Sequence, residues 1–411
     1  MTRKGILVVS IPYTARRESW VSSLRIPTEP PMRTLDVCET RLHKVIARGI
    51  VLVLALCAVM SDAIADTRLS GESAVVEADT VTITDATGRQ VRVGLPVKRI
   101  AFHHFQTAEA IQILNAWDRV VARGRDLDAA LFRGLADIPV ISAQGVYDID
   151  VERVLALEAD VLLSIDLPMA GADELIARLS PHVPVVSLNF RDPETFDDNL
   201  HKLALLLGKQ HEAQTYLTWY HAVVAQLQAK AATVPEAQKP RVFVKTSWGE
   251  PSDIQSFSDL SPGIAERNAL TASVNAAQDL PSQGGWVQAV DPEWLIAQDI
   301  DAMVIMDVVH QGYGFGVTDR TPLERHRQAV MALPAFSLWP AVQRDQVYMI
   351  SGELFATPRF IIGFAYMAKW FHPERYRDLS PEALHGEYLQ RFMRVPADVQ
   401  KQGVFVHPDR P

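Results

Sequence analysis

Two adjacent histidines, His103 and His104, are followed by Phe105 and come directly after an apolar segment that ends at Phe102. An imidazole nitrogen can ligate iron or donate a hydrogen bond to an anionic chelator, and an aromatic ring can stack on a flat ligand. A bare metal ion generally needs three or four ligands. These residues therefore indicate contact with a metal chelate, with direct ligation by the two histidines as one form of it. A capping or surface role is the alternative for each histidine.

A second set of polar and aromatic residues lies in segments that we expect to be loops. Gln144 and Tyr147 follow a short apolar strand at Val140-Ile141. In the second half of the chain, aromatic residues stand close to glycines, at Trp248, Trp286, Tyr313 and Phe315. Glycine has no side chain to pack and loses much backbone entropy on folding, so rings in such loops can stack on a porphyrin, corrin or catechol face. Packing of one or two of these rings beneath the neighbouring loop is the alternative.

A third set, Glu353, Phe355 and Arg359, precedes the last long apolar helix pattern. The planar guanidinium of Arg359 can hold a ligand carboxylate through two parallel hydrogen bonds. A structural ion pair at the start of the helix is the alternative for this residue. Together the three sets form the predicted ligand-binding site.

Composition and motif content argue against several other functions. The chain has 411 residues, of which 48% are hydrophobic and 22% charged, as is ordinary for a globular protein. Its net charge of −9 argues against a broad nucleic-acid-binding surface. The sequence has no H-E-x-x-H or G-x-S-x-G motif, no P-loop and no dinucleotide-binding glycine motif. We therefore expect a binding protein that is not an enzyme and has no cofactor of its own. We also expect it to be a monomer.

An α/β fold must position these residues. Short apolar strands alternate with helical patterns from Arg99 to Leu188, and the same rhythm resumes at Arg241. This alternation predicts a mainly parallel, doubly wound sheet in each half, and the long helical pattern between the halves is divided by Gly208. We expect an N-terminal lobe at residues 79–208, a linker helix at 209–234, a C-terminal lobe at 240–376 and a helical tail at 377–411.

One segment is repeated in the two halves. Residues 152–166 and 293–307 align without gaps, and this alignment pairs Glu152 with Glu293. An aspartate that can cap a helix precedes each copy, at Asp150 and Asp291. Each copy is predicted to be a helix followed by a buried strand. Repeated units in two halves joined by a helix predict a bilobed protein with a cleft between its lobes.

The N-terminal segment has the three parts of an export signal. A cationic stretch from Arg41 to Arg48 precedes an apolar run from Gly49 to Met60 and an Ala63-Ile64-Ala65 cleavage site. The apolar run is shorter than the ~20 residues of a membrane-spanning helix. We expect a signal peptide at 32–65, preceded at 1–31 by an extension that lies upstream of the true start, and periplasmic localisation. A lipoprotein anchor at Cys57 is the alternative.

The order and spacing of these features resemble those of one protein family. The marks are the opening Arg99-Ile-Ala-Phe…Thr107-Ala-Glu-Ala-Ile, the two helix–strand units, and Pro358-Arg359 before His372-Pro373-Glu374. They resemble the periplasmic substrate-binding proteins of ABC importers that carry iron–siderophore complexes, haem and cobalamin. The resemblance extends from Val81 to Tyr376. In that family a single long helix joins two α/β lobes.

The resemblance implies that the cleft captures an iron complex, either a ferric siderophore or haem, and delivers it to an ABC permease. It also implies that Glu152 and Glu293 contact arginines on the outer face of the permease, with stabilisation of the helix dipole as the alternative. A corrinoid such as cobalamin is the alternative ligand, and a tetrapyrrole chelatase is the alternative activity. Some hydroxamate binders of the family have an arginine in the loop of Gln144, and its absence here argues against a hydroxamate siderophore.

Overall fold

The computed structural model describes segments that all belong to one compact unit, Leu69–Pro411. They are residues 74–77, 79–125, 127–142, 148–165, 172–247, 250–280, 287–307, 312–396, 399 and 403–408. The predicted extension, signal peptide and Cys57 lie outside these residues, as do Gln144, Tyr147, Trp248 and Trp286. Among the segments described, there is no helix of the length and apolarity needed to cross a membrane.

A small antiparallel sheet opens the described chain. Its strands, in spatial order, are β1 (Ala74–Val76), β2 (Thr80–Thr84) and β3 (Gln90–Gly94). The alternating pattern of β2 turns Val81 and Ile83 into the core.

The N-terminal lobe contains a parallel sheet with the strand order β5-β4-β6-β7. Its strands are β4 (Ile100–Phe102), β5 (Val120–Ala122), β6 (Val161–Ser164) and β7 (Val185–Ser187). Its helices are α2 (Phe105–Ile113), η1 (Trp117–Arg119), η2 (Leu135–Asp137), α3 (Val151–Ala156) and α4 (Ala172–Leu179). Every residue of β4, β6 and β7 is buried, as is typical of parallel strands that are covered on both faces.

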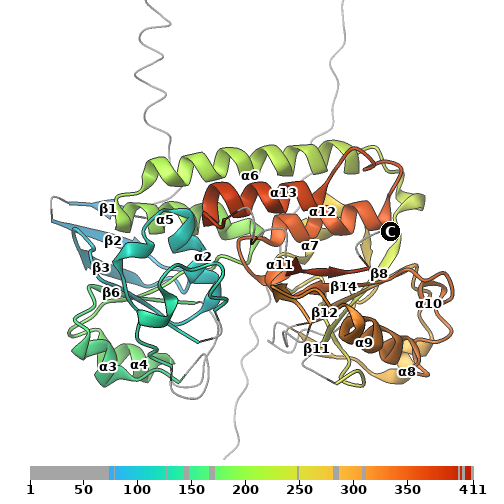
Figure 1. Ribbon diagram of the computed structural model, residues 1–411, viewed down its shortest axis with the longest axis horizontal. Coiled ribbons are helices and arrows are strands. Elements are labelled where there is room, and N and C mark those ends of the chain that lie inside the picture. The colour runs from blue at the N-terminus through green and yellow to red at the C-terminus, as the bar shows by residue number, and fades with distance from the viewer. Residues whose placement is uncertain are drawn as a thin grey trace, which may run out of the picture. The chain divides into compact units, whose positions relative to one another are not determined.

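Two helices, α5 (Pro193–Leu207) and α6 (Gln210–Ala231), connect the lobes. Gly208 separates them in the left-handed conformation, with a φ of 63°, which glycine adopts without steric cost. Asp192 caps α5, because its Oδ1 accepts a hydrogen bond from the backbone N–H of Glu194. Figure 1 shows α6 running along the same side of both lobes.

The C-terminal lobe has a seven-stranded sheet with the order β11-β9-β8-β12-β14-β16, and β10 also pairs with β8. Its strands are β8 (Arg241–Ser247), β9 (Gln255–Ser256), β10 (Val274–Asn275), β11 (Gln288–Ala289), β12 (Ala302–Asp307), β14 (Val347–Ser351) and β16 (Val406–His407). The central strands β8, β12 and β14 are parallel, and the edge strands β9, β11 and β16 are antiparallel to their neighbours. The sequence does not predict β16, which the C-terminal tail supplies.

The remaining elements surround this sheet and form the tail. They are η3 (Glu236–Gln238), α7 (Ile264–Thr271), α8 (Pro292–Ile296), β13 (Gly314–Phe315), α9 (Thr321–Met331), α10 (Pro340–Gln343), α11 (Glu353–Ala356), α12 (Phe360–Phe371), α13 (Pro381–Tyr388), η4 (Leu389–Met393) and β15 (Gly403–Val404). In the tail at 377–411, which we expected to be helical, α13 continues into η4 as a π-helical turn, and the short strands β15 and β16 follow. The predicted α/β fold class, with two mainly parallel sheets, is confirmed.

The internal repeat is visible in matching hydrogen bonds. In the N-terminal lobe, the backbone N–H of Asp160 donates to the carbonyl of Arg99 at 2.8 Å, and Asp160 Oδ2 accepts from the Arg99 N–H at 2.8 Å. In the C-terminal lobe, Asp301 and Arg241 exchange the same two bonds, each at 2.9 Å. The paired aspartates therefore fasten each repeated strand to the strand beside it.

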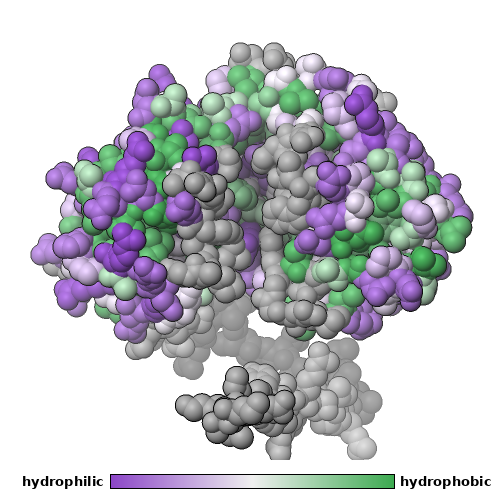
Figure 2. Space-filling view, turned by 90° about the horizontal axis from the view of Figure 1, so that it is seen from below, coloured by the Kyte–Doolittle hydropathy of each residue, from purple (hydrophilic) through white to green (hydrophobic). Residues whose placement is uncertain are grey.

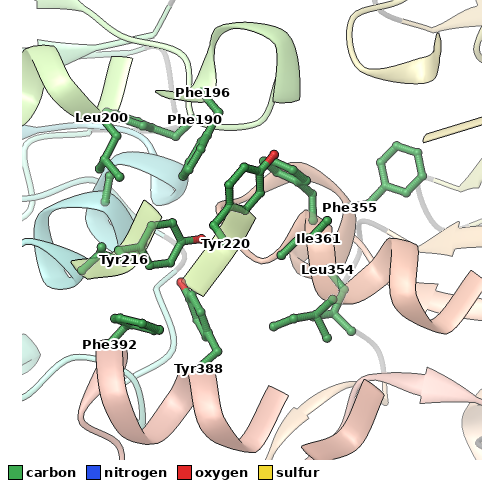
Figure 3. Packing of buried hydrophobic residues seen from close by; sticks show 14 of the residues in the cluster. Phe190, Phe196, Leu200, Tyr216, Tyr220, Leu354, Phe355, Ile361, Tyr388 and Phe392 are labelled. Atoms are coloured by element: carbon green, nitrogen blue, oxygen red, sulfur yellow. The ribbon is translucent and has the colours of Figure 1, made fainter. Parts of the chain in front are cut away.

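One hydrophobic cluster extends through both lobes and the linker helices. Aromatic rings form its centre: the ring of Phe196 on α5 lies 5.5 Å from Phe360 on α12, and the ring of Tyr216 on α6 lies 4.9 Å from Phe392. Figure 3 shows the rings of Phe196, Tyr216 and Phe392 converging from α5, α6 and the C-terminal helices. The lobes thus share a core through the helices that join them.

Candidate functional site

The parallel strands of the two sheets place polar residues at their carboxyl edges, where open α/β sheets bind ligands. In the N-terminal lobe, His103 directly follows β4 and Ser164 ends the neighbouring strand β6. His103 Nε2 lies 2.9 Å from Ser164 Oγ, and the histidine is 1% exposed. Gly124 is needed beside it, because a Cβ there would lie 2.0 Å from the His103 carbonyl oxygen.

His104 caps helix α2. Its Nδ1 accepts a hydrogen bond from the backbone N–H of Gln106 at 3.4 Å, and its ring lies 4.2 Å from the half-buried ring of Phe105. Burial holds the pKa of His104 well below its usual value, and the charges of His103 and Arg191 lower it further. A neutral imidazole at pH 7 follows. The capping role that the sequence left open for this histidine is the one observed.

The rings of His103 and His104 are edge-to-face, with their centroids 6.5 Å apart. In the part of the chain that the structure describes, no three His, Cys, Asp or Glu side chains come together as a set of metal ligands. Ligation of a chelated metal by either histidine stays a prediction. Because Nδ1 of His104 already accepts a hydrogen bond, its neutral ring can donate from Nε2 to an anionic chelator.

Arg191 is a charged residue near this edge that was not predicted from the sequence as a site residue. It lies just after β7, is 8% exposed, and its backbone N–H donates to Asn189 Oδ1 at 3.1 Å. The positive charge of the Arg191 guanidinium lowers the pKa of the His104 ring. Arg191 could have been found from the strand pattern at Val183 to Leu188, because residues that follow such a strand lie at the carboxyl edge of the sheet.

The C-terminal lobe has an equivalent edge. Lys245 and Thr246 stand near the end of β8, while Asp307 and Ser351 end β12 and β14. The register pairs Asp307 with Ser351, and the backbone N–H of Gly352 donates to the Asp307 carbonyl at 2.8 Å. Lys245 is completely buried and was not recognised from the sequence.

Four predicted contact residues of this lobe are in the core or at its margin. Tyr313 is 5% exposed within a hydrophobic cluster, and half-buried Phe315 lies edge-to-face with Phe405, with the ring centroids 5.0 Å apart. Phe355 stacks on Phe257, with the ring centroids 5.3 Å apart. Glu353 begins α11, and its side chain is 16% exposed. Packing therefore accounts for most of the surface of these rings.

Arg359 forms the structural ion pair that the sequence left as an alternative. The guanidinium is fully buried, and Nη2 donates to Glu109 at 2.9 Å and to Glu353 at 2.8 Å. The Tyr388 hydroxyl also donates to Glu109, at 2.8 Å. Burial raises the pKa of Glu109, while Arg359 opposes this change. Since Glu109 lies on α2 and Arg359 precedes α12, this network joins the two lobes.

The two acidic residues of the repeat are exposed. The Glu152 side chain is 85% exposed and lies 3.9 Å from an Arg178 nitrogen, and Glu293 is exposed on α8. Asp150 and Asp291 cap their helices, because their Oδ1 atoms accept hydrogen bonds from backbone N–H groups of the first turn. Figure 2 shows the face opposite α6 hollowed between the two lobes of the Leu69–Pro411 unit.

Comparison with known proteins identifies the family. Residues 108–354, more than half of the chain, match the periplasmic binding protein family. An uncharacterised ABC transporter substrate-binding lipoprotein of Bacillus subtilis, YvrC, is 24% identical over 338 residues, which cover 80% of this chain and 98% of the relative.

Solved structures share the fold at lower identity. The TroA-like periplasmic binding protein FepB of Veillonella parvula is 19% identical, with a TM-score of 0.62, over 79% of this chain and 98% of its own. Helicobacter pylori CeuE with Ni(II) bound is 15% identical, with a TM-score of 0.62, over 78% and 98%. A periplasmic haem-binding protein of Pseudomonas aeruginosa is 20% identical, with a TM-score of 0.54, over 68% and 94%. With its two α/β lobes, its linker helices and this match, the chain belongs to the periplasmic binding protein family.

Proposed function

We propose that the protein is an extracytoplasmic solute-binding protein that captures an iron complex, a ferric siderophore or haem, between its lobes and delivers it to an ABC permease. One observation carries the proposal. In a chain of this family, polar side chains lie at the carboxyl edges of the parallel strands in both lobes. His103 and Arg191 stand at one edge, and Lys245 stands at the other. Imidazole and cationic side chains suit the anionic oxygen atoms of an iron chelate.

The names of the similar proteins support a role in transport. The Bacillus subtilis relative is named as an ABC transporter substrate-binding lipoprotein, and the Pseudomonas aeruginosa structure is that of a haem-binding protein. Our proposal extends both descriptions, ABC transport and haem binding, to this chain. Export by the signal peptide at 32–65 is the first choice, and the relative's lipid anchor favours keeping Cys57 as the alternative.

A panel titration tests this function. The purified protein is titrated with haemin, a ferric tricatecholate, a ferric trihydroxamate and cyanocobalamin, and binding is followed by tryptophan fluorescence and by thermal stabilisation. A ligand that binds only the folded protein raises the melting temperature in a concentration-dependent way. We expect saturable binding of haemin or the tricatecholate, with weaker binding of the trihydroxamate.

The panel also separates the alternatives. Binding of cyanocobalamin alone selects the corrinoid function. Absence of binding by all four compounds contradicts an iron-complex carrier. Conversion of a bound tetrapyrrole, detected by a change of its absorption spectrum over time, selects the chelatase activity instead.

A further inference from the structure

The C-terminal tail contacts both lobes. Helix α13 begins at Pro381, the π-helical turn η4 follows, and the short strands β15 and β16 come last. We call the described residues between 381 and 408 the C-terminal strap. The ring of Tyr388 on α13 lies 6.0 Å from that of Trp219 on α6, and Figure 1 shows the two helices side by side. The strap therefore runs along the helix that already links the lobes.

One end of the strap is attached to helix α2 of the N-terminal lobe. Nε2 of Gln112, a residue that is 8% exposed, donates to the carbonyl of Met393 at 2.9 Å. In return, Arg394 Nη1 donates to the Gln112 carbonyl at 2.7 Å. About one turn earlier on α2, Glu109 accepts a hydrogen bond from the Tyr388 hydroxyl. Residues three apart lie on the same face of a helix, so one face of α2 binds the strap at two points.

The backbone of the strap has an uncommon conformation at this end. Arg394 has a φ of 58°, in the left-handed region that a Cβ disfavours. Its guanidinium bonds both to the last turn of η4, at the Phe392 carbonyl, and to α2. Such conformations and π-helical turns persist where surrounding contacts hold them, often at functional sites. The end of η4 is therefore shaped by its attachment to α2.

The other end of the strap is attached to the carboxyl edge of the C-terminal sheet. β15 pairs with β13, and the N–H of Ser351, which ends β14, donates to the Phe405 carbonyl at 2.9 Å. The Phe405 ring is edge-to-face with Phe315 of β13 and with His385 of α13, at centroid distances of 5.0 and 4.8 Å. Gly403 leaves room for this ring, because a Cβ there would lie 2.7 Å from Phe405 Cε2. Phe405 thus joins the strap to β13.

The two attachments connect elements that begin at the two carboxyl edges. Helix α2 begins beside His103, which follows β4, and β13 is the next element after β12. Lobes that are joined through a hinge rotate about a few residues, and an attachment outside the hinge restricts this rotation. The strap is such an attachment, because it reaches α2 and β13 rather than α5 or α6.

We propose that the C-terminal strap is a second connection between the lobes, and that Gln112 and Phe405 are positioning residues that hold the two carboxyl edges at the spacing the cargo requires. A site that is ordered before its ligand arrives binds at a lower entropic cost. The connection is independent of what the protein binds, whereas the role in cargo binding rests on the proposed function.

The test measures the distance between the lobes. Spin labels are attached at Glu152→Cys and Glu293→Cys, which are exposed positions on the two lobes. The two cysteines of the sequence are replaced by serine, as Cys38→Ser and Cys57→Ser. Double electron–electron resonance then gives the distribution of distances without ligand, and the affinities for the ferric tricatecholate and haemin are measured on the unlabelled proteins.

Two variants each release one end of the strap. Gln112→Met/Arg394→Met removes the hydrogen bonds to α2 with side chains of similar length, and Phe405→Leu removes the ring that packs on β13. The matched control is Gln390→Met/Arg391→Met, which makes the same two substitutions at exposed positions of η4.

We expect one narrow distribution for the wild type and the control, and distributions about twofold wider or more for both strap variants. Both variants should bind the complex about threefold or more weakly, because the apparent affinity falls with the fraction of molecules in the binding-competent arrangement. Urea denaturation of each protein separates a loss of spacing from a loss of stability.

Equally narrow distributions in all four proteins would overturn the connection, even where a strap variant is less stable. Wider distributions with an unchanged affinity for a complex that the wild type binds would overturn the positioning role of Gln112 and Phe405. If the wild type binds neither complex, the proposed cargo is wrong, and the distance distributions alone support or overturn the strap as a connection.

Discussion

Arg359 holds the carboxylates of Glu109 and Glu353 at a place where its own side chain is fully buried. Removing the cation of such a group leaves carboxylates buried without compensation, which typically costs about 3–5 kcal/mol. We therefore expect Arg359→Met to lower the free energy of unfolding by about this amount, as measured by urea denaturation.

The control is Arg391→Met. Arg391 pairs with Glu387 on the surface, where both side chains are about half exposed. Exposed ion pairs of this kind contribute about 0–1 kcal/mol. A loss in Arg359→Met no larger than that in Arg391→Met would show that the buried network does not stabilise the fold.

The site residues show what a sequence can reveal about individual side chains. The pattern of strands placed His103 correctly at a carboxyl edge, because the position after a strand is a local property. It left the roles of His104 and Arg359 open, since capping and ion pairing depend on partners such as Glu109, which lies 250 residues before Arg359. Lys245 was missed because a lysine inside a strand pattern gives no local sign of burial.

Helices α5 and α7 meet at their N-termini, where Gly263 lies against Pro193. Glu194 and Glu266 occupy the first turns of these two helices. Burial raises the pKa of Glu266 to about 7, and the neighbouring carboxylate of Glu194 raises it as well. Glu266 therefore takes up a proton near neutral pH.

The folded-state pKa of Glu266 is higher than its ordinary value of 4.5, so the protonated form stabilises the folded protein. This stabilisation is complete below about pH 4.5 and is lost as the pH rises through about 7. We expect the melting temperature of the wild type to fall more steeply between pH 5 and 8 than that of Glu266→Gln, whose amide donates at every pH.

Glu212→Gln is the control for this pH effect. Its hydrogen bond to Lys209 lowers the pKa of Glu212, so this carboxylate stabilises the folded protein above its unfolded pKa, and the effect is lost only in more acidic solution. Parallel pH profiles for the wild type and Glu266→Gln between pH 5 and 8 would contradict a raised pKa of Glu266 at the α5–α7 contact.

At the scale of elements, apolar strands of three or more residues and long helical patterns were predictable, and the two-residue strands of the tail were not. Apolar runs such as Ala302 to Asp307 and the helical spacing around Gly208 carry their own periodicity, and both appear where expected. Strands β15 and β16 have two residues each. They pair with β13 and β14 through tertiary packing. A segment of two residues is too short to show the alternation by which a strand is predicted from sequence.

The whole molecule combines a duplicated unit with a shared core. The repeat gives each lobe a capped helix, an exposed glutamate and a buried strand fastened by an aspartate. The continuous hydrophobic cluster and the Arg359–Glu109 pair tie these lobes together. Two acidic groups on bodies that are held by a common core can present a fixed two-point charge pattern to a partner.

We expect the double charge reversal Glu152→Lys/Glu293→Lys to abolish uptake of the transported complex by the native host, because it replaces attraction to a basic permease surface with repulsion. The affinity of the purified protein for the same complex should change by less than about twofold, since both side chains are exposed on helices and neither belongs to the polar residues that end the strands. The two properties are measured by radiolabelled iron uptake and by fluorescence titration.

Charge reversal in a first helical turn also opposes the helix dipole, at a cost of about 0.3–1 kcal/mol. Glu236→Lys/Glu382→Lys is the matched control, because both glutamates are exposed in the first turns of other helices, η3 and α13. If both double variants reduce uptake equally, the effect is one of stability. Only a loss confined to the Glu152/Glu293 pair assigns this face of the repeat to docking, since the control shares its dipole penalty but not its position.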